Sequence, residues 1–315
     1  MQRILLDCDP GHDDAIAILL AAHAPGIQLE AITTVAGNQT LEKTTRNALK
    51  VCSVAGIRDV PIAAGMDRPL VRPLRVAADI HGASGLDGPS LPEPDVTPAP
   101  IHGVDLLIER LLASDGDLTI VATGPLTNVA AALRREPRIA PKIQQIVLMG
   151  GAMGLGNVTP AAEFNIYVDP EAAHVVFTCG RPITMIGLDV THQAQATSEV
   201  RSRIRALGSP VAHLVDDLLG FFAKTYHQVF GFPAPPVHDP CAVALVIDPT
   251  LIRSQPMSVD VELSGEWTAG RTVCDMYGVT GKPANVHVGL ELDGPRFWNL
   301  LIETLATYGT QTQPT

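Results

Sequence analysis

Short apolar runs alternate with longer stretches of helical periodicity through the first two thirds of the chain. The runs contain few polar residues, which is typical of strands covered on both faces of a parallel sheet. We predict strands at Ile4–Leu6, Leu29–Thr34, Leu118–Ala122, Ile146–Met149 and Ile183–Ile186, and helices at Asp13–His23, Leu41–Ala55, Leu126–Arg135 and from about Asp169. This alternation predicts βαβ units, and therefore an α/β fold with a mostly parallel sheet and helices on both faces.

The segment 66–100 interrupts the alternation, because it is rich in Pro and Gly around a polar core at His81–Gly88. A segment this long without periodicity is usually functional or mobile in a compact domain. In the last third we predict helices near Val200–Phe230, Pro240–Ile247 and Arg296–Tyr308, and strands at Met257–Leu263, Thr272–Tyr277 and Val286–Leu290. No repeat or linker is evident, so we predict one domain over residues 1–309 and a disordered tail over 310–315.

Composition narrows the possible partners and compartment. The 315 residues are 46% apolar and carry a net charge of −11, which argues against a nucleic-acid partner and is compatible with a small neutral ligand. The five cysteines are widely separated, which predicts free thiols rather than disulfides or a zinc site. The N-terminal apolar run is too short for a signal peptide, and Ala15–Ala22 is too short to span a bilayer. We therefore expect a cytoplasmic protein with no membrane partner.

The densest group of acidic residues is the motif LLDCDPGHDDA at Leu5–Ala15. Asp7 and Asp9 are two apart on a predicted strand and share one face of it. Asp13 and Asp14 begin the next helix. We expect the four carboxylates to converge where a parallel strand ends, which is the edge at which open α/β sheets bind ligands.

Each carboxylate also has a structural explanation. Asp13 and Asp14 favour a helix N-terminus electrostatically, and Asp7 fits a buried hydrogen-bonding residue. These explanations do not account for all four together, because crowded carboxylates in a partly buried site repel one another unless a cation or protons relieve them. An all-oxygen group of this kind predicts calcium or magnesium rather than zinc.

Two shorter motifs are ambiguous when taken alone. In VHDPCA, Asp239 before Pro240 fits a helix N-cap followed by proline at the first helical position, and His238 fits a surface histidine. VATGPLTN at Val121–Asn128 is a strand end followed by a helix start, where the glycine permits close backbone approach.

The stretch GNVTPAAEFNIYVDPEAA at Gly156–Ala173 places Asn157, Glu163 and Asn165 in a loop before a helix. Amides and carboxylates on a loop can reach a polyhydroxylated ligand, although turn formation also explains Asn157. For Asp169 we favour helix capping.

Together these motifs resemble those of the inosine–uridine nucleoside hydrolase family. The opening DCDPGHDDA, the TGPLTN turn, the MGGA strand end, the AEFNIYVDPEA segment and the HDP triplet occur in the family's order, from about Ile4 to Tyr308. Within the family, DIHGASGLDG and the sequence GLDVTH at Gly187–His192 are similar to the pyrimidine-specific ribonucleoside hydrolases of bacteria.

The resemblance implies a single domain with Rossmann-like topology, a homo-oligomer (tetramer or dimer) and one calcium ion at the base of the pocket. By motif match, the calcium ligands would be the side chains of Asp9, Asp14 and Asp239 and the backbone carbonyl of Thr123. The residues implied to hold the ribose are Asp13, Asn38, Asn157, Glu163 and Asn165, with Met149 also at the substrate and with His81 and His238 near the base.

The implied reaction is hydrolysis of the N-glycosidic bond of a ribonucleoside to ribose and free base, with uridine and cytidine preferred. Asp9 would act as general base toward the attacking water. The neighbouring carboxylates would stabilise the positive charge that develops on the sugar. His238 is our candidate for the donor to the leaving base.

The segment Lys224–Pro236 departs from the nearest relatives, because it is shortened and rich in proline. The family uses this region to contact the base. Its aromatic residues recur at near-helical spacing, so Tyr226 and His227 could line the pocket, whereas core packing is favoured for Phe230.

Three alternatives remain open at this point. A purine or non-specific nucleoside hydrolase has the same metal and ribose residues. An aspartate-nucleophile phosphatase also begins with a strand and D-x-D, so that Asp7 would attack phosphate, but the chain lacks a well-placed later lysine. A non-catalytic ribose- or nucleoside-binding protein explains the Asn and Glu residues but not clustered carboxylates.

Overall fold

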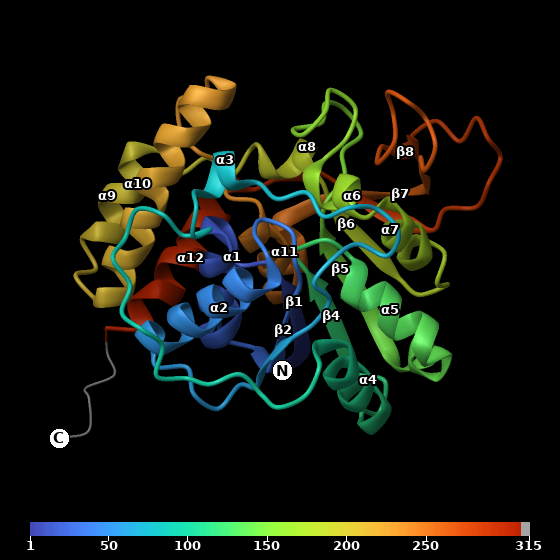
Figure 1. Ribbon diagram of the computed structural model, residues 1–315. Coiled ribbons are helices and arrows are strands. Elements are labelled where there is room, and N and C mark those ends of the chain that lie inside the picture. The colour runs from blue at the N-terminus through green and yellow to red at the C-terminus, as the bar shows by residue number, and fades with distance from the viewer. Residues whose placement is uncertain (310–315) are drawn as a thin grey trace.

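Within residues 1–309, the part of the chain that this computed structural model describes, nine strands form one sheet at the centre of the molecule (Figure 1). The strands are β1 (Gln2–Cys8), β2 (Ile27–Thr34), β3 (Ile62–Ala64), β4 (Leu118–Ala122), β5 (Ile143–Met149), β6 (Ile183–Ile186), β7 (Ile252–Val261), β8 (Thr272–Asp275) and β9 (Val286–Leu292). The tail predicted at 310–315 lies outside the described residues.

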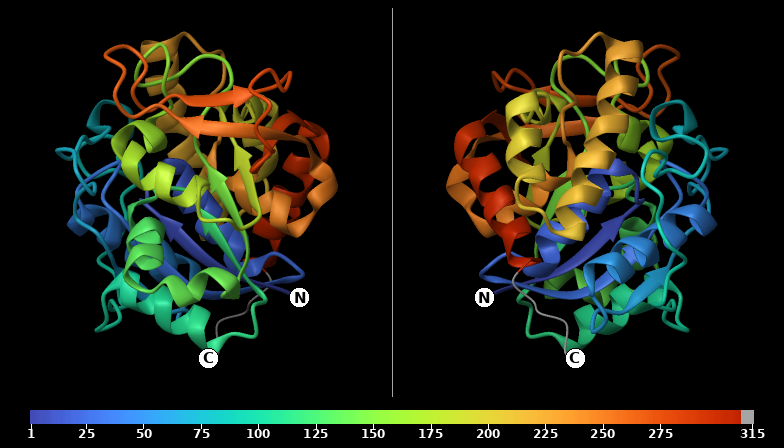
Figure 2. Two further views of the ribbon diagram at one scale, coloured as in Figure 1. Left: turned by 90° about the vertical axis from the view of Figure 1, so that its right-hand side faces the viewer. Right: turned by 90° about the vertical axis from the view of Figure 1, so that its left-hand side faces the viewer.

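The strand order is β3-β2-β1-β4-β5-β6-β9-β7-β8. All neighbours from β3 to β9 are parallel, and β7 and β8 extend the sheet in antiparallel fashion, as the orange strands of Figure 2 show. The first six strands have the order of a Rossmann sheet, with the switch point between β1 and β4. The predicted α/β fold with a mostly parallel, Rossmann-like sheet is confirmed.

Helices cover both faces of the sheet (Figure 1). One face carries α1 (His12–His23), α2 (Leu41–Ala55), α11 (Asp239–Ile247) and α12 (Gly294–Thr307), with α9 (Ser198–Arg205) and α10 (Pro210–Phe230) packed outside them. The other face carries α4 (Gly103–Ala113), α5 (Thr127–Arg135) and α7 (Pro170–Phe177). The remaining helices are short: α3 (Ala78–His81), α6 (Phe164–Val168), α8 (Leu188–Thr191) and the 3-10 helices Pro137–Lys142 and Pro249–Leu251.

The alternation of side chains along β1 explains its continuous apolar run. Ile4 and Leu6 pack into the core on the α1 side, and Leu5 packs into the core on the α4 side. All three are fully buried, because successive residues of a strand point to opposite faces and both faces are covered.

The sequence located most elements but not all. Leu41–Ala55, Leu118–Ala122 and Ile183–Ile186 have the predicted bounds, whereas β3 and α4 were not predicted. No helix within residues 1–309 is long and apolar enough to cross a membrane.

Candidate active site

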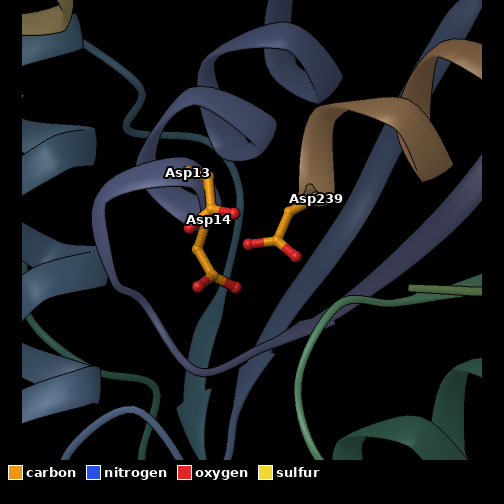
Figure 3. Close-up of side chains that lie close together, drawn as sticks. All are labelled: Asp13, Asp14 and Asp239. Carbon is orange, nitrogen blue, oxygen red and sulfur yellow. The ribbon is translucent and has the colours of Figure 1, made fainter. Parts of the chain in front are cut away.

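Acidic side chains gather at the carboxyl ends of β1 and β4, on the switch point of the sheet. The chain leaves β1 through a short loop and enters α1, whose first turn carries Asp13 and Asp14. Asp239 comes from the first turn of α11, which packs beside α1. Carboxylate oxygens of the three residues lie within 4.8 Å of one another. Figure 3 shows the three side chains close together.

Asp9 lies immediately beside this group. Its Oδ2 accepts a hydrogen bond from the backbone N–H of Asn38 at 2.6 Å, but its Oδ1 is buried and has no partner among the described residues. Asp14 is tied to the same loop, since it accepts hydrogen bonds from the backbone N–H of Gly11 and from the Thr123 hydroxyl. Strand β1, strand β4 and helix α1 therefore hold the carboxylates in fixed positions.

Two glycines permit this close packing. A Cβ atom at Gly37 would lie 2.1 Å from Oδ2 of Asp9, and one at Gly11 would lie 2.5 Å from Nδ1 of His81. Both distances are far below van der Waals contact. Glycine is therefore required at these positions by the approach of neighbouring side chains.

The crowding raises the proton affinity of the whole group. Burial, and secondarily the charge of Asp14, raises the pKa of Asp9 well above its usual range. Burial raises the pKa of Asp13 to about 7, and also raises those of Asp14 and Asp239. Because carboxylate oxygens of Asp13, Asp14 and Asp239 lie within 4.8 Å of one another, the three cannot all be ionised without a cation between them.

These residues fit a hard cation. The donors are all oxygen atoms, and the unpartnered Oδ1 of Asp9 is a buried acceptor that the protein itself does not satisfy. Oxygen donors of this kind suit calcium or magnesium. The group could therefore bind a metal ion.

Asp7 does not belong to this group. Its Oδ1 accepts hydrogen bonds from the Thr33 hydroxyl at 2.5 Å and from the Asn128 amide at 2.7 Å. The structure thus gives Asp7 the hydrogen-bonding role that was the alternative for it, and three carboxylates of the opening motif, rather than four, face the site.

A cavity of about 160 Å³ opens over the carboxylates. Most of the residues that the sequence singled out line it, namely Asp13, Asn38, His81, Thr123, Met149, Asn157, Glu163, Asn165, Tyr226, His238 and Asp239. Asp9 and Asp14 are fully buried behind this lining. His227 is exposed and lies outside it, so the structure does not bring His227 to the cavity.

The polar side of the cavity is built around α6. Glu163 caps this helix, because its carboxylate accepts hydrogen bonds from the backbone N–H groups of Asn165 and Ile166. Burial raises the pKa of Glu163 to about 7. The Asn165 amide donates to the carbonyl of Thr123 at 2.7 Å, and the Asn157 carbonyl accepts from the backbone of Phe164. These side chains are held rigidly at the cavity wall.

The aromatic side of the cavity comes from the last turns of α10. Tyr226 is buried, and its hydroxyl lies 2.6 Å from Nε2 of His238. Phe222 and Phe230 lie one turn before and one turn after it, and both line the cavity. Phe230 is 37% exposed, so the predicted core packing of Phe230 is wrong: the helix ends at Gly231, and its last turn stands at the cavity mouth.

His238 is a buried residue and not a surface histidine. Its Nδ1 lies 2.7 Å from the Thr191 hydroxyl, so both ring nitrogens have protein partners. Burial lowers the pKa of His238 to about 3, which keeps the ring neutral. The sequence did not single out Thr191 or Phe222, although GLDVTH contains the first and the periodicity of α10 contains the second.

The two capping predictions had different outcomes. Asp169 accepts hydrogen bonds from the backbone N–H of Ala172 and from the Thr127 hydroxyl, which confirms its capping role. Helix α11 begins at Asp239 itself, and no side chain caps it, so the N-cap interpretation of Asp239 is wrong. Its carboxylate turns instead toward Asp14, as Figure 3 shows.

The Rossmann strand order and an acidic cavity at its switch point define a single-domain α/β protein with an enzyme-type site. Comparison with known proteins makes this class specific. A model of the inosine-uridine preferring nucleoside hydrolase family matches residues 4–299. The chain therefore belongs to the inosine-uridine preferring nucleoside hydrolase family, whose members cleave the N-glycosidic bond of nucleosides.

Individual relatives agree with this assignment. The pyrimidine-specific ribonucleoside hydrolase RihA of Citrobacter koseri is 50% identical over 309 residues, which cover 98% of this chain and 99% of the relative. RihB of Escherichia coli O157:H7 is 50% identical over 307 residues, which cover 98% of each chain. A purine-preferring ribonucleoside hydrolase from Gardnerella vaginalis has a similar structure, with a TM-score of 0.91 at 34% identity over 98% of this chain and 99% of that chain. The phosphatase and the non-catalytic binding protein are therefore set aside.

Proposed function

We propose that this nucleoside hydrolase prefers pyrimidine ribonucleosides and converts uridine and cytidine to ribose and the free base. The observation that carries the proposal is the 50% identity over nearly the full length to two hydrolases named pyrimidine-specific. The purine-preferring enzyme of similar structure is only 34% identical. The cavity of about 160 Å³, with its aromatic wall, is compatible with a small planar base.

We propose calcium as the resident metal. Asp9, Asp14 and Asp239 and the carbonyl of Thr123 would hold it, with Asp13 beside them. A bound divalent cation would lower the pKa of water and neutralise the crowded carboxylates. The buried, unpartnered Oδ1 of Asp9 and the contact between Asp14 and Asp239 support this assignment.

The positions of the side chains suggest which step of the reaction each of them carries out. Asp9 accepts a proton from the attacking water, and the carboxylate of Asp13 stabilises the positive charge that develops on the sugar. Both ring nitrogens of His238 have protein partners, and its Nε2 lies 2.6 Å from the Tyr226 hydroxyl. We propose that the Nε2–H of His238 donates to the Tyr226 oxygen, which leaves the Tyr226 proton for the leaving base, so that the donor role proposed for His238 passes through Tyr226.

Base preference is the direct test of the proposal. We expect kcat/KM for uridine and cytidine to exceed that for inosine and adenosine by at least about tenfold, since modest differences in pocket contacts are worth about this much. The measurement is kcat/KM for the four ribonucleosides at one pH with calcium present. A value for inosine equal to that for uridine would overturn the pyrimidine preference and favour a purine or non-specific enzyme.

Sugar selectivity tests the polar wall of the cavity. We propose that Asn157, Glu163 and Asn165 hold the ribose hydroxyls, because all three line the cavity and are fixed by backbone contacts. Deoxyuridine should therefore be a poorer substrate than uridine by roughly 10²-fold or more in kcat/KM, because a site built to bind a hydroxyl rejects an analogue that lacks it. Equal values for the two nucleosides would refute this role.

Two expectations from the sequence remain proposals. We propose a reducing cytoplasmic location, which the free state of all five cysteines supports. We also propose a homo-oligomer, a tetramer or dimer, which sedimentation of the purified protein would test.

A further inference from the structure

A second histidine, His12, lies behind the cavity and is not explained by the proposed reaction. His12 belongs to the first turn of α1 and is fully buried, but it does not line the cavity. Its ring stacks on Phe221 at 5.0 Å and an interplanar angle of 5°. Its nearest polar neighbour on the cavity side is His81, which does line the cavity.

Three polar contacts link His12 to its neighbours. Its Nε2 lies 2.8 Å from the backbone carbonyl oxygen of Asp87. Its Nδ1 lies 3.1 Å from Nδ1 of His81, and its backbone N–H points to the same His81 atom at 3.3 Å. These three contacts cannot all be hydrogen bonds while both rings are neutral. With the His12 hydrogen on Nε2, Nδ1 of His81 would have to be unprotonated to accept from the backbone N–H and protonated to donate to Nδ1 of His12.

The Asp87 carbonyl fixes the first proton. A carbonyl oxygen only accepts, so Nε2 of His12 carries a hydrogen at this shortest contact. The carbonyl is itself held in place, because the Asp87 side chain accepts hydrogen bonds from the backbone N–H groups of Ala83 and Ser84. With the ring hydrogen on Nε2 at the Asp87 carbonyl, Nδ1 of His12 presents a lone pair toward His81.

The proton between the two rings therefore belongs to His81. With Nδ1 of His12 as acceptor, Nδ1 of His81 carries the hydrogen, and the longest contact, from the backbone N–H of His12, gives way. Burial lowers the pKa of His81 well below its usual range, so this ring is neutral. The nitrogen of His81 that remains for a ligand is Nε2, without a proton.

We propose that His12 is a positioning residue that fixes His81 in the Nδ1–H tautomer, so that Nε2 of His81 accepts a hydrogen bond from an N–H group on the edge of the base. This inference rests on the proposed function and on the position of His81 in the cavity lining. Uracil offers N3–H, and cytosine offers its 4-amino group, as the matching donor.

The replacement His12→Phe tests the tautomer directly. Phenylalanine keeps a ring against Phe221 but removes the Nδ1 acceptor, and the backbone N–H at position 12 remains to donate to Nδ1 of His81. We expect His81 to change from the Nδ1–H to the Nε2–H tautomer, read from the 15N shifts of histidine-labelled, calcium-loaded protein. The matched control is His23→Phe, at a histidine that stacks on Tyr308 away from the cavity, and it should leave the His81 shifts unchanged.

Substrate selectivity gives the second readout. We expect the ratio of kcat/KM for uridine over 3-methyluridine, which lacks N3–H, to fall by at least about tenfold in His12→Phe, since the acceptor that prefers N3–H is lost. The tautomer of His81 can also be measured in the wild-type protein without any variant, and an Nε2–H tautomer there would overturn the inference. So would an unchanged ratio in a folded His12→Phe enzyme. Failure of the proposed function is distinct, because inosine would then match or exceed uridine as a substrate of the wild type while the tautomer of His81 remains measurable.

Discussion

Replacement of Asp9 by Asn is expected to lower kcat by roughly 10²–10⁴-fold for loss of the proton acceptor, with further loss from weaker metal binding. The carboxylate is fully buried at the end of β1, and its Oδ1 has no protein partner among the described residues. Asparagine has nearly the same shape and keeps an acceptor for the backbone N–H of Asn38, so the fold should persist. The measurement is kcat for uridine at saturating substrate and calcium, with circular dichroism to verify folding.

Asp7→Asn is the matched control, because Asp7 is an equally buried carboxylate two residues away. Its Oδ1 accepts hydrogen bonds from Thr33 and Asn128, its Oδ2 is buried without a partner among the described residues, and Asp7 does not line the cavity. An amide oxygen at this position can still accept both hydrogen bonds. Asp7→Asn should therefore keep kcat within about tenfold of the wild type. A near-normal kcat for folded Asp9→Asn would show that the proton acceptor lies elsewhere, with Asp13 as the next candidate because it lines the cavity.

The spacing of apolar residues predicted those helices and strands whose secondary structure depends on their own residues. β4 is bounded on its carboxyl side by a turn and is buried throughout, with Thr119 as its single polar residue, and its predicted and observed bounds agree. β3 has only three residues, too few for a pattern, and it is a strand because it pairs with β2. The helix α4 was not predicted although its apolar residues Val104, Leu107 and Leu111 have helical spacing. Of these two elements, only β3 depends on tertiary pairing for its secondary structure.

The site shows the same division between local and distant information. The spacing of Asp9, Asp13 and Asp14 on one strand and helix start was sufficient to predict an acidic group. Asp239 joins that group from 225 residues later, and only the resemblance to a family indicated it. The local pattern around Asp239 favoured a helix cap, which the structure contradicts.

Contacts between side chains could not be predicted from the sequence at all. The pairing of Tyr226 with His238 joins the end of α10 to the start of α11 across the turn at Gly231. The exposure of His227 follows from the helical phase of α10, which turns its neighbour Tyr226 into the cavity and His227 away from it. Phe222 and Tyr226, four residues apart, share the buried face of α10, and this spacing is visible in the sequence.

Removal of bound metal should abolish activity, and calcium should restore it. Without a cation, the carboxylates of Asp13, Asp14 and Asp239 lie within 4.8 Å of one another and must take up protons. A protonated group neither stabilises a positive sugar nor leaves Asp9 as a base. Metal-free protein should also unfold at a lower temperature. At calcium 100-fold above its Kd, binding contributes about 2.7 kcal/mol, which corresponds to roughly 4 °C in Tm for a domain of this size.

The test is dialysis against a calcium-selective chelator, followed by measurement of uridine hydrolysis and Tm before and after addition of calcium or magnesium. Recovery with calcium at lower concentration than with magnesium would support calcium, because a crowded carboxylate group suits the larger cation with more oxygen ligands. Asp14→Asn is the matched variant: it should show low activity and a Tm that responds weakly to calcium, since Asp14 touches both Asp239 and the Thr123 hydroxyl. Full activity in protein shown by elemental analysis to be metal-free would refute the metal assignment and leave the family assignment intact.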